Sequence, residues 1–317
     1  TMKIIKRPDG NRNYLTDENS AEFLNYNGRI KIELRGSSSM ELPKKSYSLT
    51  TVKSDNTSNN NVSILGMPSE NDWILNSLAF DPSLIRDYLS YDISRKMGNY
   101  ASRTQYCEVV LNGDYIGLYV FQEKIKANAN RVDVAKIEKT DNNFNNLTGI
   151  YITKAYIPDI NEPPTWVMED TNFVHVLPKP ENATPEQTAY IKGEFDRFSD
   201  NLYNYDLENG YQTIIDVPSF VDFMLVNELS SNAEAYQYST FFHKDRGGKL
   251  RAGPIWDLNL SFGSSFTNSS DVDQWQFSNG NKTGPWFWAG LFDNRTFPCY
   301  FSRRWNEMIQ PTKPINL

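Results

Sequence analysis

Alternating apolar and charged side chains predict a strand-rich first half of the chain. Residues Arg29–Leu34 alternate cleanly, and the alternation resumes at Tyr47–Leu49 after a proline break. A period of two is typical of strands with one buried face. Two further strands are predicted at residues 105–111 and 116–121, because Asn112-Gly113 between them is a strong signal for a tight hairpin.

Helical spacing marks three segments. Asp81-Pro82 has the capping carboxylate and first-turn proline of a helix start, and apolar residues recur at helical spacing up to Met97, so we expect a helix that packs on the sheet. Thr184-Pro185 begins a second helix, to about Tyr205, and the apolar run 218–230 predicts a buried helix. Shorter strands are predicted at residues 149–154, 173–177, 238–243 and 249–252. The pattern indicates an α+β fold with a more helical second half.

Composition supports a folded chain with a sizeable core. Of 317 residues, 39% are hydrophobic and 14% aromatic, which excludes disorder for most of the chain. The polar, Asn-rich stretch at residues 53–62 has too little apolar surface to offset its ordering entropy and is expected to be a surface loop.

Charge and hydropathy argue against nucleic acid and a membrane span. The net charge of −7 and the absence of a basic run argue against nucleic acid, because neutralising phosphates requires a cationic face. No stretch approaches the roughly 20 apolar residues that cross a bilayer. No charged-then-apolar leader precedes Thr1, so we expect a soluble chain from which any signal peptide has been removed.

The cysteines and histidines say little about disulfides or metal sites. Cys107 shares a predicted strand face with Val109 and is expected to be a buried thiol, while a disulfide to Cys299 is left open because sequence does not supply the required Cα separation. The two histidines, His175 and His243, offer no metal pair.

The strongest chemical signal lies in the apolar run Pro254–Gly263, which contains one carboxylate and one amide. If the run is a strand that continues into a turn, Asp257 and Asn259 lie on the same face, where their oxygens can hold one hard cation. The alternative is that Asp257 accepts backbone N–H bonds in a loop.

Two cations in the first half flank a possible phosphate site. Arg35 and Lys45 lie on either side of a Gly-Ser-Ser-Ser turn, which offers backbone N–H groups and hydroxyls. The alternative is a serine-rich loop with solvated cations. Gly36 is the only glycine of this turn and no Gly-Lys-Ser/Thr follows, so the segment is not a Walker-type loop.

Four segments together resemble one known family. In order and spacing they are similar to the CotH family, the spore-coat-type atypical protein kinases that are also found among secreted bacterial and fungal proteins. The resemblance spans roughly residues 28–310 and is carried by Arg35–Tyr47, Asp81–Asp87, Asn112–Ile125 and Trp256-Asp257.

The resemblance implies a fold and an activity. The fold would be α+β and bilobal, like an atypical protein kinase, with a single domain over residues 1–317 that divides into a β-rich part (about 1–154) and a helix-richer part (155–317). The protein would be secreted or on the cell surface, like spore-coat proteins. It would transfer the γ-phosphate of ATP to Ser or Thr hydroxyls of a protein substrate, with Mg²⁺ or Mn²⁺.

The resemblance also implies roles for individual residues. Asp257 and Asn259 would bind the metal, and the nucleotide would be bound by Arg35, Lys45, Glu123 and Lys154. Glu123, at the end of the predicted hairpin, would pair with Lys45 or reach a metal, as in a kinase lysine–glutamate pair; a surface ion pair is the alternative. Arg86 is expected to be architectural, pairing with a carboxylate.

The chain departs from the family pattern at the expected catalytic base. Where family members usually have Asn-x-Asp, the aspartate position is Glu234. The extra methylene moves the carboxylate by about one bond length, and catalytic geometry is sensitive to shifts of about 1 Å. Members also usually continue beyond the segment resembling Phe301–Glu307, so we expect a naturally short chain or a missing part of the second half.

Two other functions compete with a kinase. The first is a non-catalytic CotH-like binding or surface-attachment module, a pseudokinase or adhesin. It is supported by the change at Glu234 and by an aromatic cluster able to stack on sugar or peptide, although such clusters usually belong to a core: Trp275, Trp286, Phe287 and Trp288. The second, weaker alternative is a glycoside-active enzyme with paired carboxylates, for which no particular pair can be named.

Overall fold

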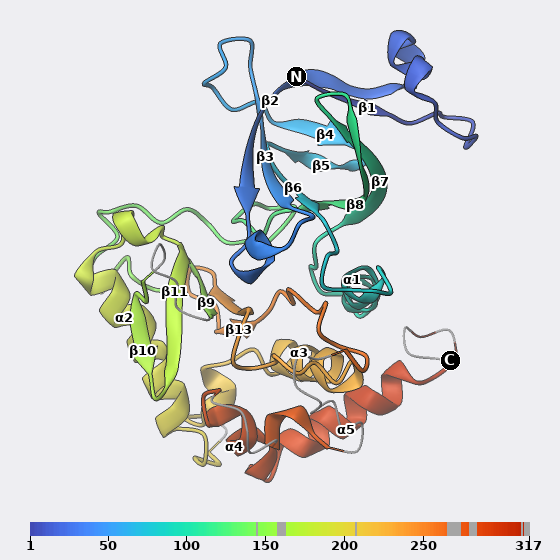
Figure 1. Cartoon of the computed structure of the whole chain (residues 1–317). Helices are drawn as coiled ribbons and strands as arrows, with labels where there is room; N and C mark the ends of the chain where they lie inside the picture. The colour runs from blue at the N-terminus through green and yellow to red at the C-terminus, as the bar shows by residue number, and fades with distance from the viewer. Residues whose placement is uncertain are drawn as a thin grey trace. The chain divides into compact units, whose positions relative to one another are not determined.

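The fold is α+β and consists of two compact units (Figure 1). The computed structural model describes residues 1–143, 145–156, 163–206, 208–264, 274–278, 284–311 and 313. The first unit comprises Thr1–Pro82 and Ser102–Lys124, and the second comprises Ser83–Ala101 and Ile125–Leu317. The boundaries between these units therefore differ from the approximate boundary expected at residue 154. Across the described ranges, no helix is both long and apolar enough to span a membrane.

The first unit is built on an antiparallel sheet of six strands in the order β1-β2-β3-β6-β8-β7. Its strands are β1 (Met2–Ile5), β2 (Leu24–Arg35), β3 (Ser46–Val52), β6 (Asp72–Asn76), β7 (Thr104–Leu111) and β8 (Asp114–Glu123); β4 (Val62–Ile64) and β5 (Met67–Glu70) form a separate pair. The predicted strands and hairpin are confirmed. Both Asn112 and Gly113 have positive φ, 53° and 95°, as the tightest hairpin turns require.

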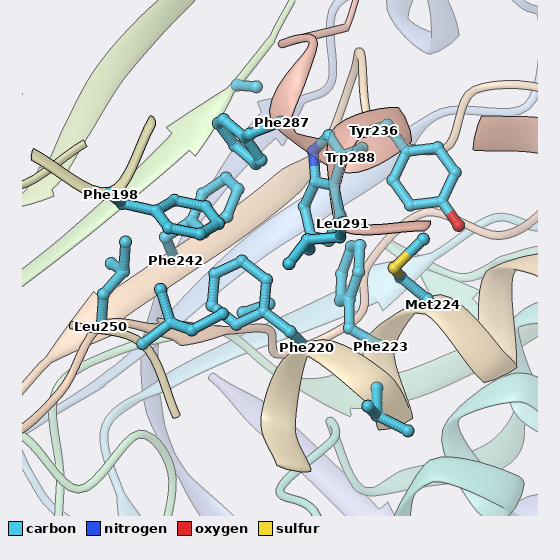
Figure 2. Close-up of a cluster of buried hydrophobic side chains, with 14 of the residues drawn as sticks. Phe198, Phe220, Phe223, Met224, Tyr236, Phe242, Leu250, Phe287, Trp288 and Leu291 are labelled. Carbon is cyan, nitrogen blue, oxygen red and sulfur yellow. The ribbon is translucent and has the colours of Figure 1, made fainter. Parts of the chain in front are cut away.

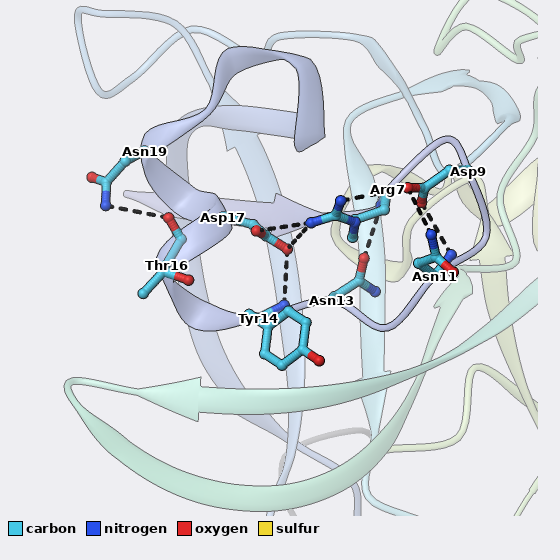
Figure 3. Close-up of polar contacts among 8 residues, drawn as sticks. All are labelled: Arg7, Asp9, Asn11, Asn13, Tyr14, Thr16, Asp17 and Asn19. Atoms are coloured by element: carbon cyan, nitrogen blue, oxygen red, sulfur yellow. Dashed lines mark hydrogen bonds and ion pairs between the residues drawn. The ribbon is translucent and has the colours of Figure 1, made fainter.

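A long connection between β1 and β2 is held by a polar network rather than by a core. The guanidinium of Arg7 pairs with Asp17 (3.2 Å) and with Asp9 (3.4 Å), and the backbone N–H of Tyr14 donates to Asp17 Oδ2 (2.9 Å) (Figure 3). Arg7 also lies over the ring of Phe23, 4.1 Å from its centroid. These contacts order a segment that contributes few apolar residues.

The core of the first unit lies on one face of the six-stranded sheet. Trp73 and Phe121 stack there with ring centroids 5.2 Å apart, and Leu49 and Tyr119 are buried beside them. Cys107 packs against this cluster, and desolvation raises the pKa of its thiol to about 11. Both cysteines of the chain are free, so the disulfide left open by the sequence does not form.

The second unit combines five helices with a five-stranded sheet, counted over its described residues. The strand order is β10-β11-β9-β12-β13, and all pairings are antiparallel. The strands are β9 (Tyr151–Ala155), β10 (Trp166–Met168), β11 (Thr171–Leu177), β12 (Thr240–Lys244) and β13 (Arg251–Ala252), and the helices are α1 (Arg86–Lys96), α2 (Pro185–Asp200), α3 (Val217–Leu229), α4 (Phe287–Asp293) and α5 (Phe297–Met308). The predicted start of α2 at Thr184-Pro185 is confirmed, and a capping box closes it: the Gln187 N–H donates to Thr184 Oγ1, and the Thr184 N–H to Gln187 Oε1.

Helix α1 differs from its prediction. It begins at Arg86 rather than at Asp81, because Leu84 has a left-handed backbone (φ 63°) that a helix cannot include. Tyr88 and Leu89, part of the expected apolar face, are exposed, whereas Asp87 is buried, and the helix packs against α3. The expected apolar face is therefore only partly buried: Met97 and Ile93 join the core of the second unit, whereas Tyr88 and Leu89 do not.

Aromatic rings fill the centre of the second unit (Figure 2). Trp288 of α4 is buried against Phe220 and Phe223 of α3, with centroid distances of 5.3 and 5.4 Å, and against Phe242 of β12 at 5.7 Å. Nine residues of α3 are buried, which confirms the predicted buried helix. Helix α3 is thus surrounded by packing partners and fixes the loops at its ends.

Two desolvated histidines predict acid sensitivity. Burial lowers the pKa of both His175 and His243 from 6.5 to about 4. The unfolded chain therefore binds protons that the folded chain does not, and the free energy of unfolding should fall as the pH drops from about 6.5 to about 4. Urea denaturation across this range, compared with a His175→Gln/His243→Gln variant, tests this. An identical pH dependence in both proteins would contradict it.

Candidate functional site

Two loops of the second unit lie against each other. One follows α3 and carries Glu234; the other follows β13 and carries Asp257. The backbone N–H of Phe262 donates to the Ser230 carbonyl oxygen (2.6 Å), and the N–H of Ala233 donates to the Leu260 carbonyl oxygen (3.4 Å). Because these bonds tie the loops together, residues predicted from distant motifs are neighbours in the fold.

Asp257 is held in an unusual turn. Its φ is 64°, and its half-buried carboxylate accepts hydrogen bonds from the Asn259 amide Nδ2 (2.9 Å) and the Ser239 hydroxyl (3.4 Å). A strand does not extend through Asp257: the sheet ends at Ala252, where the strand predicted at residues 249–252 also ends, and the left-handed residue turns the chain so that residues 257 and 259 meet directly. Their proximity thus comes from a turn, not from a shared strand face.

Helix α1 anchors this turn. The N–H of Leu258 donates to the buried carboxylate of Asp87 (2.7 Å), and the N–H of Asp257 donates to the Tyr91 hydroxyl (3.3 Å). Arg86 Nε donates to the Ser261 carbonyl oxygen (2.8 Å), which gives this arginine an architectural contact within the unit. Arg86 and Asp87, at the end of the Asp81–Asp87 motif, are therefore bonded within the second unit to the segment that carries the Trp256-Asp257 motif.

The Glu234 loop is also ordered by side-chain amides. The N–H of Glu234 donates to Asn232 Oδ1 (3.2 Å), and the amide of Asn232 donates to Asn227 Oδ1 (2.8 Å) at the end of α3. Asn232 is buried and Glu234 is half-buried. The amide chain links the position of Glu234 to the rigid core of the unit.

Backbone strain is concentrated in these two loops. Among the described residues, twelve other than glycine have positive φ, and five of them belong to the two loops: Ser231, Tyr236, Ser239, Asp257 and Phe262. Each such residue costs on the order of 1–3 kcal/mol, and such strain persists only where the surroundings over-determine the backbone. Strain gathered around two carboxylates marks this part of the second unit as the candidate site.

Comparison with protein families finds a match over most of the chain. The family model described as CotH kinase protein matches residues 32–312. The chain belongs to the CotH family. A comparison with curated proteins finds no match.

The other CotH motif residues lie in the first unit. Arg35 ends β2 and is half-buried, and the turn after it favours glycine, because the φ of Gly36 is 116°, which other residues rarely adopt. Lys45 lies on the other side of this turn, directly before β3. Its ammonium donates to the Met40 carbonyl oxygen (2.5 Å). The two cations thus flank a short 3-10 helix at Ser38–Glu41, where the sequence predicted a turn.

Glu123 is paired differently from the kinase-like expectation. It is fully buried at the end of β8, and its carboxylate accepts from the backbone N–H of Arg103 (3.0 Å) and from its guanidinium (2.8 Å). The expected Lys45 partner contacts the Met40 carbonyl oxygen instead. The Glu123 carboxylate of this ion pair is buried in the sheet. The pair is therefore not the surface ion pair that was the alternative.

Lys154 lies on β9, the central strand of the second sheet. It is half-buried, and its Nζ lies 5.2 Å from the centroid of the Tyr156 ring. β9 pairs with β11 on one side and β12 on the other, which fixes the backbone of this lysine firmly. A rigid strand is a suitable support for a phosphate-binding cation.

The oxygen donors near Asp257 suit magnesium bound together with a nucleotide. The described residues include no group of three or more His, Cys, Asp or Glu side chains that can hold a metal alone. Mg²⁺ usually takes one or two carboxylates, with waters and substrate phosphates completing its shell. Asp257, the Ser239 hydroxyl and, after an amide rotation, the Asn259 oxygen match that donor set.

Three supporting residues were missed by the sequence. Asp87 and Tyr91 anchor the Asp257 turn, and Ser239 donates to its carboxylate. Asp87 lies within the Asp81–Asp87 motif, but its role depends on the packing of α1 beside residue 258, which no local pattern reports. Nothing in the sequence pattern distinguishes Ser239 from the other serines of the loop.

The aromatic cluster divides between core and surface. Phe287 and Trp288 are buried, as expected of core residues, whereas Trp286 and Trp275 are 39% and 51% exposed. Trp286 stacks on Tyr203 with centroids 5.9 Å apart. Only the exposed pair remains available for contact with a ligand.

Proposed function

We propose that this CotH protein is an atypical protein kinase that transfers the γ-phosphate of ATP to Ser or Thr hydroxyls of proteins outside the cytoplasm. The observation that carries the proposal is the strained turn in which Asp257, Asn259 and Ser239 converge beside the Glu234 loop. The description of the family as kinases supports the same activity. A kinase-like bilobal fold, with the two units as lobes, is part of the proposal.

Each residue has a role in this proposal. Asp257 and Asn259 hold Mg²⁺ or Mn²⁺, which neutralises charge on the phosphates when bound. Glu234 orients the acceptor hydroxyl and accepts its proton. Arg35, Lys45 and Lys154 bind phosphate oxygens, and Glu123 belongs to the same nucleotide-binding set. Positioning and electrostatic stabilisation account for most of the catalysis in phosphoryl transfer, so a pre-set turn is a suitable device.

A binding module is the second candidate. Its supporting observation is the exposed Trp286–Tyr203 stack, since aromatic faces at the surface bind sugars and peptides. The longer side chain at Glu234 also favours it. In this alternative, the site binds nucleotide without turnover or has lost nucleotide binding altogether.

Nucleotide binding and turnover are tested together. ATP with Mg²⁺ is expected to raise the thermal midpoint, because a ligand that binds only the folded state stabilises it by about 2.7 kcal/mol at about 100 times its Kd. Wild type is expected to incorporate radiolabelled phosphate into itself or a serine-rich acceptor. Glu234→Gln should abolish incorporation while leaving the ATP-induced shift nearly intact.

The variants separate the two candidates. An inert wild type with activity restored by Glu234→Asp would identify a lapsed kinase. If millimolar ATP produces no shift with or without Mg²⁺, every nucleotide-based function is excluded.

A further inference from the structure

Strand β2 is only partly covered along one edge. It runs for 12 residues from Leu24 to Arg35, but β1 pairs with it only between Leu24 and Gly28. The rest, Arg29–Arg35, pairs with β3 on its other side. Within the described part of the chain, no strand pairs with the outer edge of Arg29–Arg35, where β2 lies beside β3 in the first unit (Figure 1).

The uncovered edge is exposed and apolar on one face. Lys31, Ile32, Glu33 and Leu34 are all exposed, Ile32 by 40% and Leu34 by 58%. Natural sheets usually protect such edges with charged side chains, prolines or bulges. Residues 29–35 carry charges, Lys31 and Glu33 among them, but have no proline and pair with β3 without a bulge, and an exposed regular edge is a template for adding another strand.

The side chains of this edge are complementary to themselves. In an antiparallel pair of two β2 strands centred on Ile32, Lys31 of one copy faces Glu33 of the other, and Ile30 faces Leu34. Opposite charges directly across an antiparallel pair are stabilising, and like charges are destabilising. A shift of two residues in either direction places Lys31 opposite Lys31 or Glu33 opposite Glu33, and a shift of one mixes the polar and apolar faces.

We propose that this chain forms a homodimer in which the two β2 edges pair antiparallel about Ile32. The pairing extends from Ile30 to Leu34, because beyond these residues Arg29 would face Arg35 of the second copy. Five residues is an ordinary strand length, but the contact is small, so the dimer is weak and reversible. The proposal does not depend on kinase activity.

Charge exchange gives a specific test. In wild type, sedimentation velocity at increasing concentration up to the millimolar range should show a monomer–dimer equilibrium. Lys31→Glu and Glu33→Lys each replace two attractive pairs by two repulsive ones and should weaken association by about 10-fold or more. The double exchange, Lys31→Glu/Glu33→Lys, restores opposite charges and should recover dimerisation.

The other edge strand of the same sheet supplies the control. Glu108 is exposed on β7, and Glu108→Lys makes the same change of charge as Glu33→Lys on an edge that does not take part. It should dimerise like wild type. Hydrogen exchange within residues 30–34 should slow as concentration rises, because the outward-facing amides of this stretch become bonded in the dimer.

Several results would overturn the proposal. These are a monomer at every concentration, single exchanges that associate as well as wild type, and a double exchange that fails to recover. Complete protection of residues 29–35 in the dilute monomer would also overturn it, since another part of the chain would then cover the edge. Loss of kinase activity in any variant is a separate readout and leaves the dimer test unaffected.

Discussion

Asp257→Asn is expected to lower phosphoryl transfer by roughly 100-fold or more while leaving the fold intact. The change removes the negative charge that would hold the metal, and loss of one electrostatic group in a site of this kind has an effect of that size. The backbone tolerates it, because Asn is among the few residues that adopt a left-handed conformation readily, and φ at this position is 64°. Radiolabelled phosphate incorporation and urea denaturation measure the two quantities.

Two controls frame this result. Asp257→Ala removes the charge and also forces a less suitable residue into the left-handed turn, so it should destabilise the protein by about 1–2 kcal/mol more than Asp257→Asn. Asp196→Asn removes a charge on α2, from a carboxylate that pairs with Lys192, and should retain full activity. Transfer that survives Asp257→Asn unchanged would exclude Asp257 as a metal ligand.

Trp288→Ala is expected to reduce the free energy of unfolding by about 3–5 kcal/mol. The side chain is 1% exposed and contacts aromatic rings from α3 and β12 and the ring of Tyr236, 4.9 Å away by centroid. Its removal leaves a cavity that stiff aromatic neighbours fill poorly. Chemical denaturation monitored by circular dichroism measures the loss.

Trp286→Ala is the matched comparison, two residues away on the chain. Because Trp286 is 39% exposed and mainly stacks on Tyr203, its loss should cost no more than about 1.5 kcal/mol. Equal losses for the two variants would show that Trp288 is not the centre of the core. Loss of sugar or peptide binding on Trp286→Ala, with stability retained, would favour the binding-module alternative.

Local sequence signals predicted the elements whose structure is decided locally. The alternation of apolar and charged residues predicted β2 and β3, Asn112-Gly113 predicted the β7–β8 hairpin, and an apolar run predicted α3. The start of α1 was wrong because a left-handed Leu84 follows Asp81-Pro82, and propensity alone does not report a residue strained by its tertiary surroundings.

The candidate site was predicted as a set of residues but not as an arrangement. Motifs selected Asp257, Asn259 and Glu234, and the fold brings their loops together through the backbone bonds at Ser230 and Leu260. The turn that joins Asp257 to Asn259 and the pairing of Glu123 with Arg103 both depend on contacts from elsewhere in the chain. No local sequence pattern encodes such contacts, so the sequence predicted neither the turn at Asp257 nor Arg103 as the partner of Glu123.

The division of the chain has a consequence for its synthesis. The first unit closes only when β7 and β8 are made, after the ribosome has already passed α1. The partner of helix α1, α3, is synthesised more than a hundred residues later. Until then Tyr91 lacks the packing that buries it in the finished protein. Nascent chains of intermediate length thus carry a completed sheet with an unpacked helix inserted between β6 and β7, a species that chaperones are suited to protect.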